Sequence, residues 1–206
     1  MAQDPAPPRN GKPPDKAEID ACRGCDLWAR ATQGVAGEGS RKARLMLVGE
    51  QPGDEEDKQG KPFVGPAGKL LRRALAEAGV APAEFYLTNA VKHFSWEPRG
   101  KRRIHKTPAQ REVNACREWL EREIDAVRPR VIVALGATAL RAVTGMRVTI
   151  TAARTSELHH PLGAKIVATY HPSAVLRAPD DEGRAAMMRT LVLDLKRGAA
   201  LATKAD

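Results

Sequence analysis

The sequence contains few cysteines, three among 206 residues, and no long hydrophobic run. A small and odd number of cysteines argues against a framework of disulfide bonds and leaves a metal site or ordinary buried thiols. No apolar stretch approaches the roughly 20 residues that cross a bilayer, and the chain does not open with a charged segment followed by an apolar one. We therefore expect an intracellular, cytoplasmic protein that does not associate with membranes.

Positive charge dominates the composition. The chain has 34 Lys and Arg residues against 25 Asp and Glu residues, which gives a net charge of +9. Such an excess favours a polyanionic partner, nucleic acid more than a membrane surface. Prolines crowd residues 1–17, which we expect to be a disordered tail, followed by one domain over 18–197 and a short tail over 198–206. We expect the protein to be a monomer.

Four short apolar runs predict strands that are buried on both faces. They span residues 45–48, 85–88, 131–135 and 166–169. Helical patterns lie between and after them: one ends at Gly79, one starts with Thr107 as N-cap, one runs to about Val143, and the last spans about 181–197. Residues 146–165 are ambiguous, with a hairpin as one interpretation. This alternation predicts an α/β fold in three layers, α/β/α, around a central four-stranded parallel sheet.

Polar side chains follow the ends of three predicted strands. Glu50 to Asp54 come after the first strand, Asn89 ends the second, and His171 follows the fourth. Because ligands of such sheets bind at the carboxyl ends of the strands, we expect these side chains to converge on one crevice.

The segment Lys101–Lys106 (KRRIHK) places four cations around one histidine. The cations suit a phosphate backbone, and His105 can act as a nucleophile or proton carrier near neutral pH. Taken alone, such a segment is most often a solvated basic loop.

A pair of cysteines two residues apart indicates a possible metal site. Cys22 and Cys25 can bind one ion or cluster, Cys116 can supply a third ligand, and His93 a fourth. Zinc accepts three cysteines and one histidine, and imidazole replaces thiolate in some iron–sulfur proteins, so spacing alone does not choose between the metals. Three ordinary buried cysteines are the alternative.

Five motifs occur in an order that resembles the iron–sulfur uracil-DNA glycosylases of family 4. They are Gly49–Asp54 (GEQPGD), Pro62–Gly68 (PFVGPAG), Thr88–Lys92 (TNAVK), Leu135–Gly136 (LG) and His171–Ser173 (HPS). The basic segment with its histidine resembles the UdgX subgroup, whose members attach covalently to the abasic site that they create in DNA.

The resemblance implies a 4Fe–4S cluster and uracil-containing DNA as the partner, with single strands favoured. The cluster would be held by Cys22, Cys25, His93 and Cys116, where His93 stands in place of the family's third cluster cysteine. Gln51 occupies the position at which the related family 1 enzymes carry a water-activating aspartate. An amide cannot take a proton, so that route to hydrolysis is closed at this position.

The residue chemistry agrees with uracil excision, which needs the base rotated out of the helix and held. Phe63 offers a face for stacking, Asn89 can pair with the uracil N3–H and O4 edge, and His171 can donate to O2 as negative charge develops there. Gly65 and Gly68 would let backbone amides approach phosphate. The remaining residues expected in the substrate pocket are Gly49 and Gln51, and those expected on the DNA backbone are Lys101, Arg102, Arg103, Lys106 and Ser173.

The loss of uracil leaves an electron-poor C1′ that water captures in an ordinary glycosylase. We expect neutral His105 to capture it instead, with Glu50 or Asp54 orienting the ring or accepting its proton. The protein would then act once and remain attached.

Three alternatives remain at this stage. The first is a conventional uracil-DNA glycosylase with turnover, in which His105 only binds DNA. The second is a magnesium-dependent nuclease that uses Glu50, Asp54 and Asp57, and the third is a zinc-containing nucleic-acid-binding module without catalysis.

Overall fold

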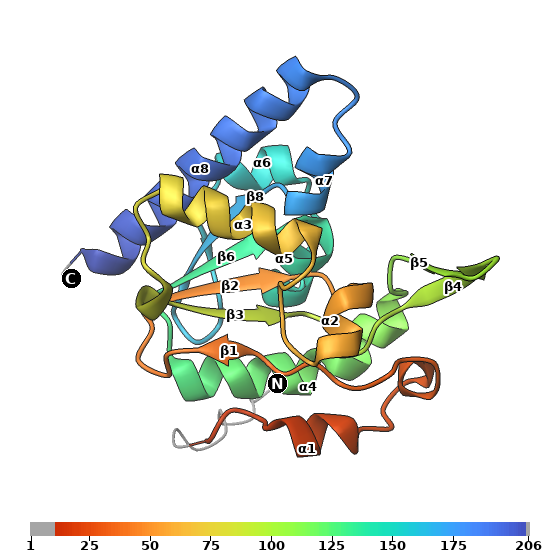
Figure 1. Ribbon diagram of the computed structural model, residues 1–206. Coiled ribbons are helices and arrows are strands. Elements are labelled where there is room, and N and C mark those ends of the chain that lie inside the picture. The colour runs from red at the N-terminus through yellow and green to blue at the C-terminus, as the bar shows by residue number, and fades with distance from the viewer. Residues whose placement is uncertain (1–10, 205–206) are drawn as a thin grey trace.

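A computed structural model describes residues 11–204 of the chain. Four parallel strands form the centre of its sheet in the order β3 (Phe85–Asn89), β2 (Leu45–Gly49), β6 (Val131–Leu135) and β8 (Lys165–Thr169). All four are buried along almost their whole length because helices cover both faces of the sheet. The predicted three-layer α/β/α fold is confirmed (Figure 1).

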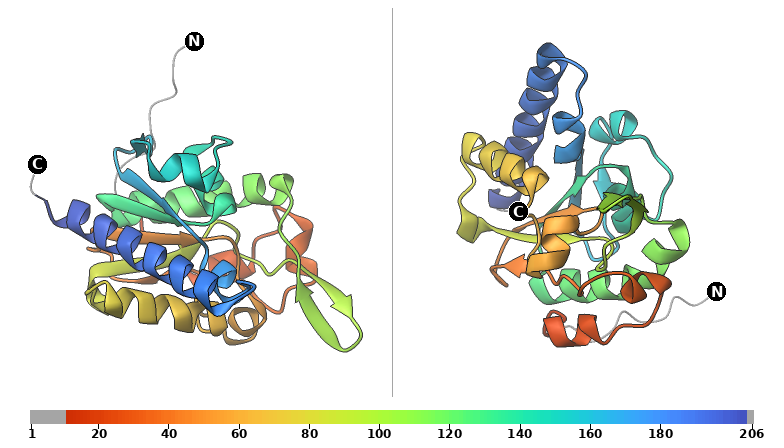
Figure 2. Two further views of the ribbon diagram at one scale, coloured as in Figure 1. Left: turned by 90° about the horizontal axis from the view of Figure 1, so that it is seen from above. Right: turned by 45° about the vertical axis from the view of Figure 1, so that its right-hand side comes forward.

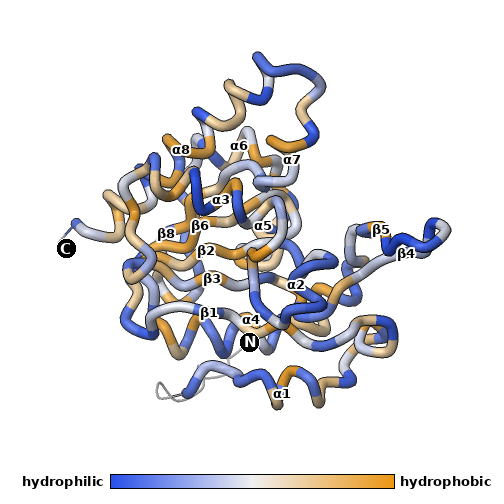
Figure 3. The backbone as a smooth tube through the Cα atoms, viewed as in Figure 1, coloured by the Kyte–Doolittle hydropathy of each residue, from blue (hydrophilic) through white to orange (hydrophobic). Residues whose placement is uncertain are grey.

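Two hydrophobic cores fill the spaces between the layers. Helices α3 (Pro66–Glu77), α7 (Pro172–Leu176) and α8 (Asp181–Thr203) cover one face, where Leu71, Leu191 and Leu195 pack on strand side chains. Helices α4 (Gln110–Val127), α5 (Ala137–Thr144) and α6 (Ile150–Arg154) cover the other face. In Figure 3 the strands of the sheet are mostly hydrophobic and α2 (Asp54–Gln59) is hydrophilic.

The sheet has six strands because a two-residue strand pairs antiparallel at each edge. These are β1 (Glu38–Gly39), beside β3, and β7 (Leu158–His159), beside β8. The ambiguous stretch 146–165 therefore contains the first strand of a hairpin, as one interpretation had it, but also helix α6. Strands of two residues are too short to produce an alternating pattern in a sequence.

The basic segment Lys101–Lys106 contains the second strand of a β-hairpin and is not the expected loop. Strand β4 (Trp96–Arg99) pairs with β5 (Arg102–His105), and Trp96 lies opposite His105. The hairpin projects from the body of the molecule in Figure 1 and in the left view of Figure 2. A hairpin with so little apolar surface is marginally stable by itself, so contacts at its base must fix its position.

Helix ends differ from the sequence prediction in two places. Helix α4 is capped by Ala109, whose N–H donates to Glu112 Oε2 at 2.6 Å, and not by Thr107. Helix α8 continues beyond the predicted end near residue 197 to Thr203, because Gly198 and Ala202 are buried against the sheet. The first ten residues of the tail predicted over 1–17 lie outside the described part of the chain, but α1 (Lys16–Asp20) begins inside the predicted tail, with Asp15 as its N-cap. Among the described helices, none is both long and apolar enough to span a membrane.

The described residues also contain two short 3₁₀ helices, η1 (Asp26–Ala29) and η2 (Pro82–Glu84).

A fully buried ion pair joins the loop after β3 to α4. Lys92 Nζ lies 2.7 Å from Glu123 Oε2, and both side chains have 0% of their surface exposed. Lys92 also donates to the Thr88 hydroxyl at 2.7 Å and to the Asn89 carbonyl at 2.8 Å. The other Glu123 oxygen accepts the Gly37 N–H at 2.9 Å. The ion pair therefore holds the backbone of Asn89 at the end of β3.

We expect Lys92→Met to lower the free energy of unfolding by about 3–5 kcal/mol, because it leaves the Glu123 carboxylate buried without its cation. Denaturant unfolding followed by circular dichroism measures this. The control Arg73→Gln breaks an exposed pair with Glu77 and should change stability by less than about 0.5 kcal/mol. Addition of Glu123→Leu to Lys92→Met should restore part of the loss. Equal effects of Lys92→Met and the control would contradict this account.

Candidate active site

A cavity of about 270 Å³ opens at the carboxyl ends of the parallel strands. The expected residues from three strand ends meet there: Glu50 and Gln51 after β2, Asn89 at the end of β3, and His171 after β8. The hairpin adds His105 from one side. The other residues that line it are Gly53, Asp54, Glu55, Glu56, Phe63, Gly65, Pro66, Ala67, Ser173, Leu176 and Arg177.

The floor of the cavity depends on the absence of a side chain at Gly49. A Cβ atom there would lie 2.4 Å from Asn89 Oδ1 and 2.5 Å from the Phe63 ring. Glycine therefore lets the Asn89 amide and the Phe63 ring both approach the backbone closely at the end of β2. The Asn89 and Phe63 side chains are both nearly fully buried.

Phe63 has a strained backbone. Its φ angle is +55°, in the left-handed region that residues other than glycine rarely adopt. Its carbonyl oxygen lies where a Cβ of Gly68 would be, at 1.9 Å, so Gly68 permits this turn of the chain. Phe63 belongs to the hydrophobic core and also lines the cavity, so the strain serves to present its ring there.

The Glu56 carboxylate accepts the hydrogen bond from the Gly65 amide, which was expected to approach phosphate. The carboxylate accepts the N–H of Gly65 at 2.8 Å and the N–H of Gly53 at 3.1 Å. The structure therefore uses Gly65 to close the loop between β2 and α3, and Glu56 holds that loop in place.

His171 has a defined tautomer. The backbone N–H of Ser173 donates to Nδ1 at 3.1 Å, and the Ser173 hydroxyl lies 2.7 Å from the same nitrogen. Because Nδ1 accepts, the proton of the neutral ring is on Nε2. Burial of the ring, followed by the nearby His105 and Arg177, lowers the pKa of His171 to about 4. At neutral pH this side chain is an uncharged N–H donor, and Ser173 is its orienting partner.

Glu50 is the carboxylate that faces His105. One of its oxygens lies 3.4 Å from His105 Nε2, and the other accepts the Thr138 hydroxyl at 2.5 Å. Thr138 stands in the first turn of α5, and no pattern in the sequence marks it as a site residue. These contacts form a row in which Thr138 orients Glu50 and Glu50 faces the imidazole.

Gln51 holds the base of the hairpin. Its amide nitrogen donates to the carbonyls of Ser95 at 3.1 Å and Lys106 at 3.0 Å, and its oxygen accepts the N–H of Ser95 at 2.9 Å. Gln51 lines the cavity, where it was expected to contact the substrate, and these three hydrogen bonds engage its amide with the residues at both ends of the hairpin.

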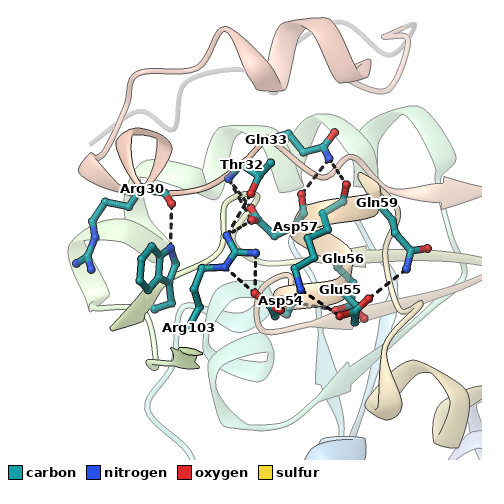
Figure 4. A network of polar contacts seen from close by, with 12 residues as sticks. Arg30, Thr32, Gln33, Asp54, Glu55, Glu56, Asp57, Gln59 and Arg103 are labelled. Atoms are coloured by element: carbon teal, nitrogen blue, oxygen red, sulfur yellow. Dashed lines mark hydrogen bonds and ion pairs between the residues drawn. The ribbon is translucent and has the colours of Figure 1, made fainter. Parts of the chain in front are cut away.

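Arg103 is bound within the protein and does not extend towards solvent. Its guanidinium lies 2.6 Å from a carboxylate oxygen of Asp54, 2.6 Å from one of Asp57, and 3.1 Å from the Thr32 hydroxyl (Figure 4). Burial opposes ionisation of Asp54, but hydrogen bonds from Lys58 and Arg103 outweigh it and lower the pKa of Asp54. Asp54 is thus committed to the hairpin, which leaves Glu50 in contact with His105.

A series of neighbouring cations and aromatic rings leads from Arg30 to His105. The Trp96 indole donates to the Arg30 carbonyl at 2.9 Å, and the Arg30 guanidinium lies 4.7 Å from the Trp96 ring centroid. Arg103 lies 5.6 Å from the Trp96 ring and 5.5 Å from the Phe94 ring, whose centroid is 6.2 Å from that of His105. The series therefore ends beside the His105 imidazole. No pattern in the sequence had marked Arg30, Phe94 or Trp96 as site residues.

The remaining cations of the hairpin face solvent. Lys101, Arg102 and Lys106 are exposed, so they are available to a phosphate backbone.

The three cysteines and His93 come from segments that lie close together. The thiol of Cys116 hydrogen-bonds to Cys25, which lowers the pKa of Cys25 to about 6, while the same contact and burial raise that of Cys116. The sulfur of Cys22 accepts N–H groups from Trp119 at 3.2 Å and Gly24 at 3.5 Å. N–H donors around a thiolate are also what iron–sulfur clusters use, so the donor set suits such a cluster. Within residues 11–204, however, no group of three or more Cys, His, Asp or Glu side chains has the geometry to bind a metal ion.

The fold and cavity define an α/β protein with polar groups at the carboxyl edge of a parallel sheet. Residues 36–196 match the family model of the uracil DNA glycosylase superfamily. The chain is 41% identical over 177 residues to the type-4 uracil-DNA glycosylase of Thermotoga maritima, covering 85% of this chain and 86% of the relative. It is 38% identical over 169 residues to that of Archaeoglobus fulgidus, covering 79% and 81%. The chain belongs to the uracil DNA glycosylase superfamily.

The tautomer and pKa of His171 give a prediction about pH. Its folded pKa lies below the ordinary value of about 6.5, so its contribution to stability is fully present above pH 6.5 and is lost as the pH falls to about 4. We expect this loss to be about 3 kcal/mol, and NMR of the imidazole nitrogens should show Nδ1 unprotonated at pH 7. His171→Gln assigns the signals and should reduce the acid sensitivity. A midpoint near 6.5 for His171 would refute the prediction.

Proposed function

We propose that the protein excises uracil from DNA and becomes covalently linked through His105 to C1′ of the abasic site. Membership of the superfamily and the similarity to type-4 uracil-DNA glycosylases support uracil excision. The observation that carries the finer proposal is the contact of His105 with Glu50 at the same cavity as Asn89 and His171. The UdgX resemblance of the basic segment points the same way.

The cavity supports recognition of uracil. Phe63 would stack on the flipped base, and the Asn89 amide would pair with its N3–H and O4 edge. His171, with its proton on Nε2, would donate to O2, where the electron pair of the broken bond from N1 to C1′ accumulates. An uncharged donor does not leave a buried cation behind once uracil has departed.

His105 would then capture the electron-poor C1′. The imidazole nitrogen that carries no proton forms the bond to C1′, and the proton on the other nitrogen passes to the Glu50 carboxylate. The alkylated ring ends neutral and is a poor leaving group. Gln51 has no basic group that could take a proton from water, because an amide oxygen accepts hydrogen bonds but is not a base. Its amide is also bound to the hairpin.

The carboxylates of the alternative magnesium nuclease have other partners. Asp57 is fully buried and accepts the Thr32 N–H and the Arg103 guanidinium, and Asp54 binds Arg103 and Lys58. Glu50 faces His105 and Thr138. These contacts favour a role in positioning the hairpin over a role in binding magnesium.

We expect His105→Ser to abolish the covalent product because serine lacks the imidazole nucleophile, while uracil release continues with water entering the vacated space. Denaturing electrophoresis of protein mixed with a uracil-bearing single strand measures the adduct, and chromatography measures free uracil. A thymine-bearing strand is the negative control. If the unaltered protein releases uracil repeatedly without an adduct, it is a conventional glycosylase with turnover.

A pair of substitutions distinguishes the two candidate proton acceptors. Glu50→Gln should strongly slow adduct formation, whereas Asp54→Asn should slow it less and act by loosening Arg103. A larger effect of Asp54→Asn would assign the proton to Asp54.

We propose that Cys22, Cys25, His93 and Cys116 hold a 4Fe–4S cluster. The contact of Cys25 with Cys116, the N–H donors to Cys22 and the burial of His93 support it. When bound, the cluster would tie the loop before η1 and the segment after β3 to α4. It would therefore stabilise the structure around the base of the hairpin.

The purified protein should contain about four iron atoms per chain and absorb broadly in the visible range. Cys116→Ser should lose most of the iron because a hydroxyl replaces a cluster thiolate, and His93→Cys should retain it. The content of iron, sulfide and zinc decides the matter. Zinc in place of iron would contradict the cluster and support a structural zinc site.

A further inference from the structure

A second cavity of about 220 Å³ lies behind the base of the hairpin. It shares a wall with the active-site cavity: the carbonyls of Ser95 and Lys106 are bound by Gln51, which lines the first cavity, and the same two residues line the second. The Lys106 N–H also donates to the Ser95 carbonyl at 3.0 Å. A single layer of backbone therefore separates the two cavities.

Cations predominate around this second cavity. Arg30, Lys106 and Arg111 line it and are exposed, with 78% of the Arg111 side chain accessible. Two carboxylates also line it, Asp26 and Glu112, but Glu112 is nearly buried and accepts the backbone N–H of Ala109. Asp26 is exposed, so three exposed cations and one exposed carboxylate face a ligand, and the balance is positive.

The walls also offer flat surfaces. Arg30 stacks on Trp96 within the cavity wall, and guanidinium planes and indole rings are the surfaces on which the bases of single strands stack. Cations beside such a surface match a nucleotide, which combines a phosphate with a planar base.

We propose that this cavity binds a nucleotide adjacent to the uridine in a single strand, with its phosphate at Lys106 and Arg111 and its base against Arg30 and Trp96. This inference rests on the proposed function, because it places the uracil in the first cavity. His105 and Lys106 are consecutive, and one lines each cavity. A strand that contacts His105 at its abasic sugar therefore has its next nucleotide beside the second cavity.

The test compares Arg111→Gln with Arg117→Gln, a control on the same helix with a side chain that is 60% exposed and lies outside this cavity. Because the proposed adduct would make binding irreversible, fluorescence anisotropy at several salt concentrations uses single strands whose uracil is carried on a 2′-fluorinated sugar, which resists cleavage because the fluorine destabilises an electron-poor C1′. The uracil stands in the centre, at the 5′ end or at the 3′ end of the strand. We expect Arg111→Gln to weaken binding of the central-uracil strand about five-fold at low salt and to reduce the salt slope by about one. The control should bind like the unaltered protein.

The two strands with a terminal uracil show on which side of the uracil the subsite lies. One of the two terminal-uracil strands lacks the neighbouring nucleotide, so the unaltered protein and Arg111→Gln should bind that strand equally. If Arg111→Gln weakens all three strands alike, or matches Arg117→Gln throughout, the subsite is refuted. Uracil release is measured in parallel on ordinary deoxyuridine strands of the same sequence, so a protein that binds as expected but releases no uracil would refute the proposed function and not the nucleotide contact.

Discussion

The position of His105 depends on the buried amide of Gln51. Its three hydrogen bonds join the end of β2 to both strands of the hairpin, through Ser95 and Lys106. A carboxylate at this position could not donate to the two carbonyls, and it would bring negative charge against them in a buried place. The glutamine that positions the hairpin therefore also leaves this position without a carboxylate that could activate water. In the proposed reaction, one side chain would therefore both position the imidazole and leave water without a base at this position.

The other contacts of the hairpin add rigidity to this attachment. Arg103 binds the carboxylates of Asp54 and Asp57 and the Thr32 hydroxyl, which come from distant segments of the chain. The rings of Trp96 and Phe94 pack beside its guanidinium. A nucleophile that is already in place loses little conformational freedom when it reacts. The cations of the hairpin therefore have two roles. Arg103 fixes the hairpin, while Lys101, Arg102 and Lys106 are exposed and available to DNA phosphates.

The sequence was sufficient to predict the parallel strands and the meeting of Glu50, Asn89 and His171, because both follow from local apolar runs and a general rule for parallel sheets. The two edge strands have only two residues each and carry no pattern of their own. Arg103 resembled a free cation because its partners precede it by 46 and 49 residues. Thr138 lies 88 residues from Glu50. Contacts of that kind become visible only when the sheet has brought the segments together.

The two histidines of the cavity have opposite proton roles, and their surroundings determine which is which. Ser173 donates to Nδ1 of His171, so that ring can only donate from Nε2 while it is neutral. The Glu50 carboxylate beside His105 can only accept. In the proposed reaction, a proton would therefore be offered where uracil leaves and removed where the sugar is captured, without a step that exchanges the roles. Water that entered this site would find an amide and no carboxylate at Gln51, and the proposed capture by the imidazole rests on that difference.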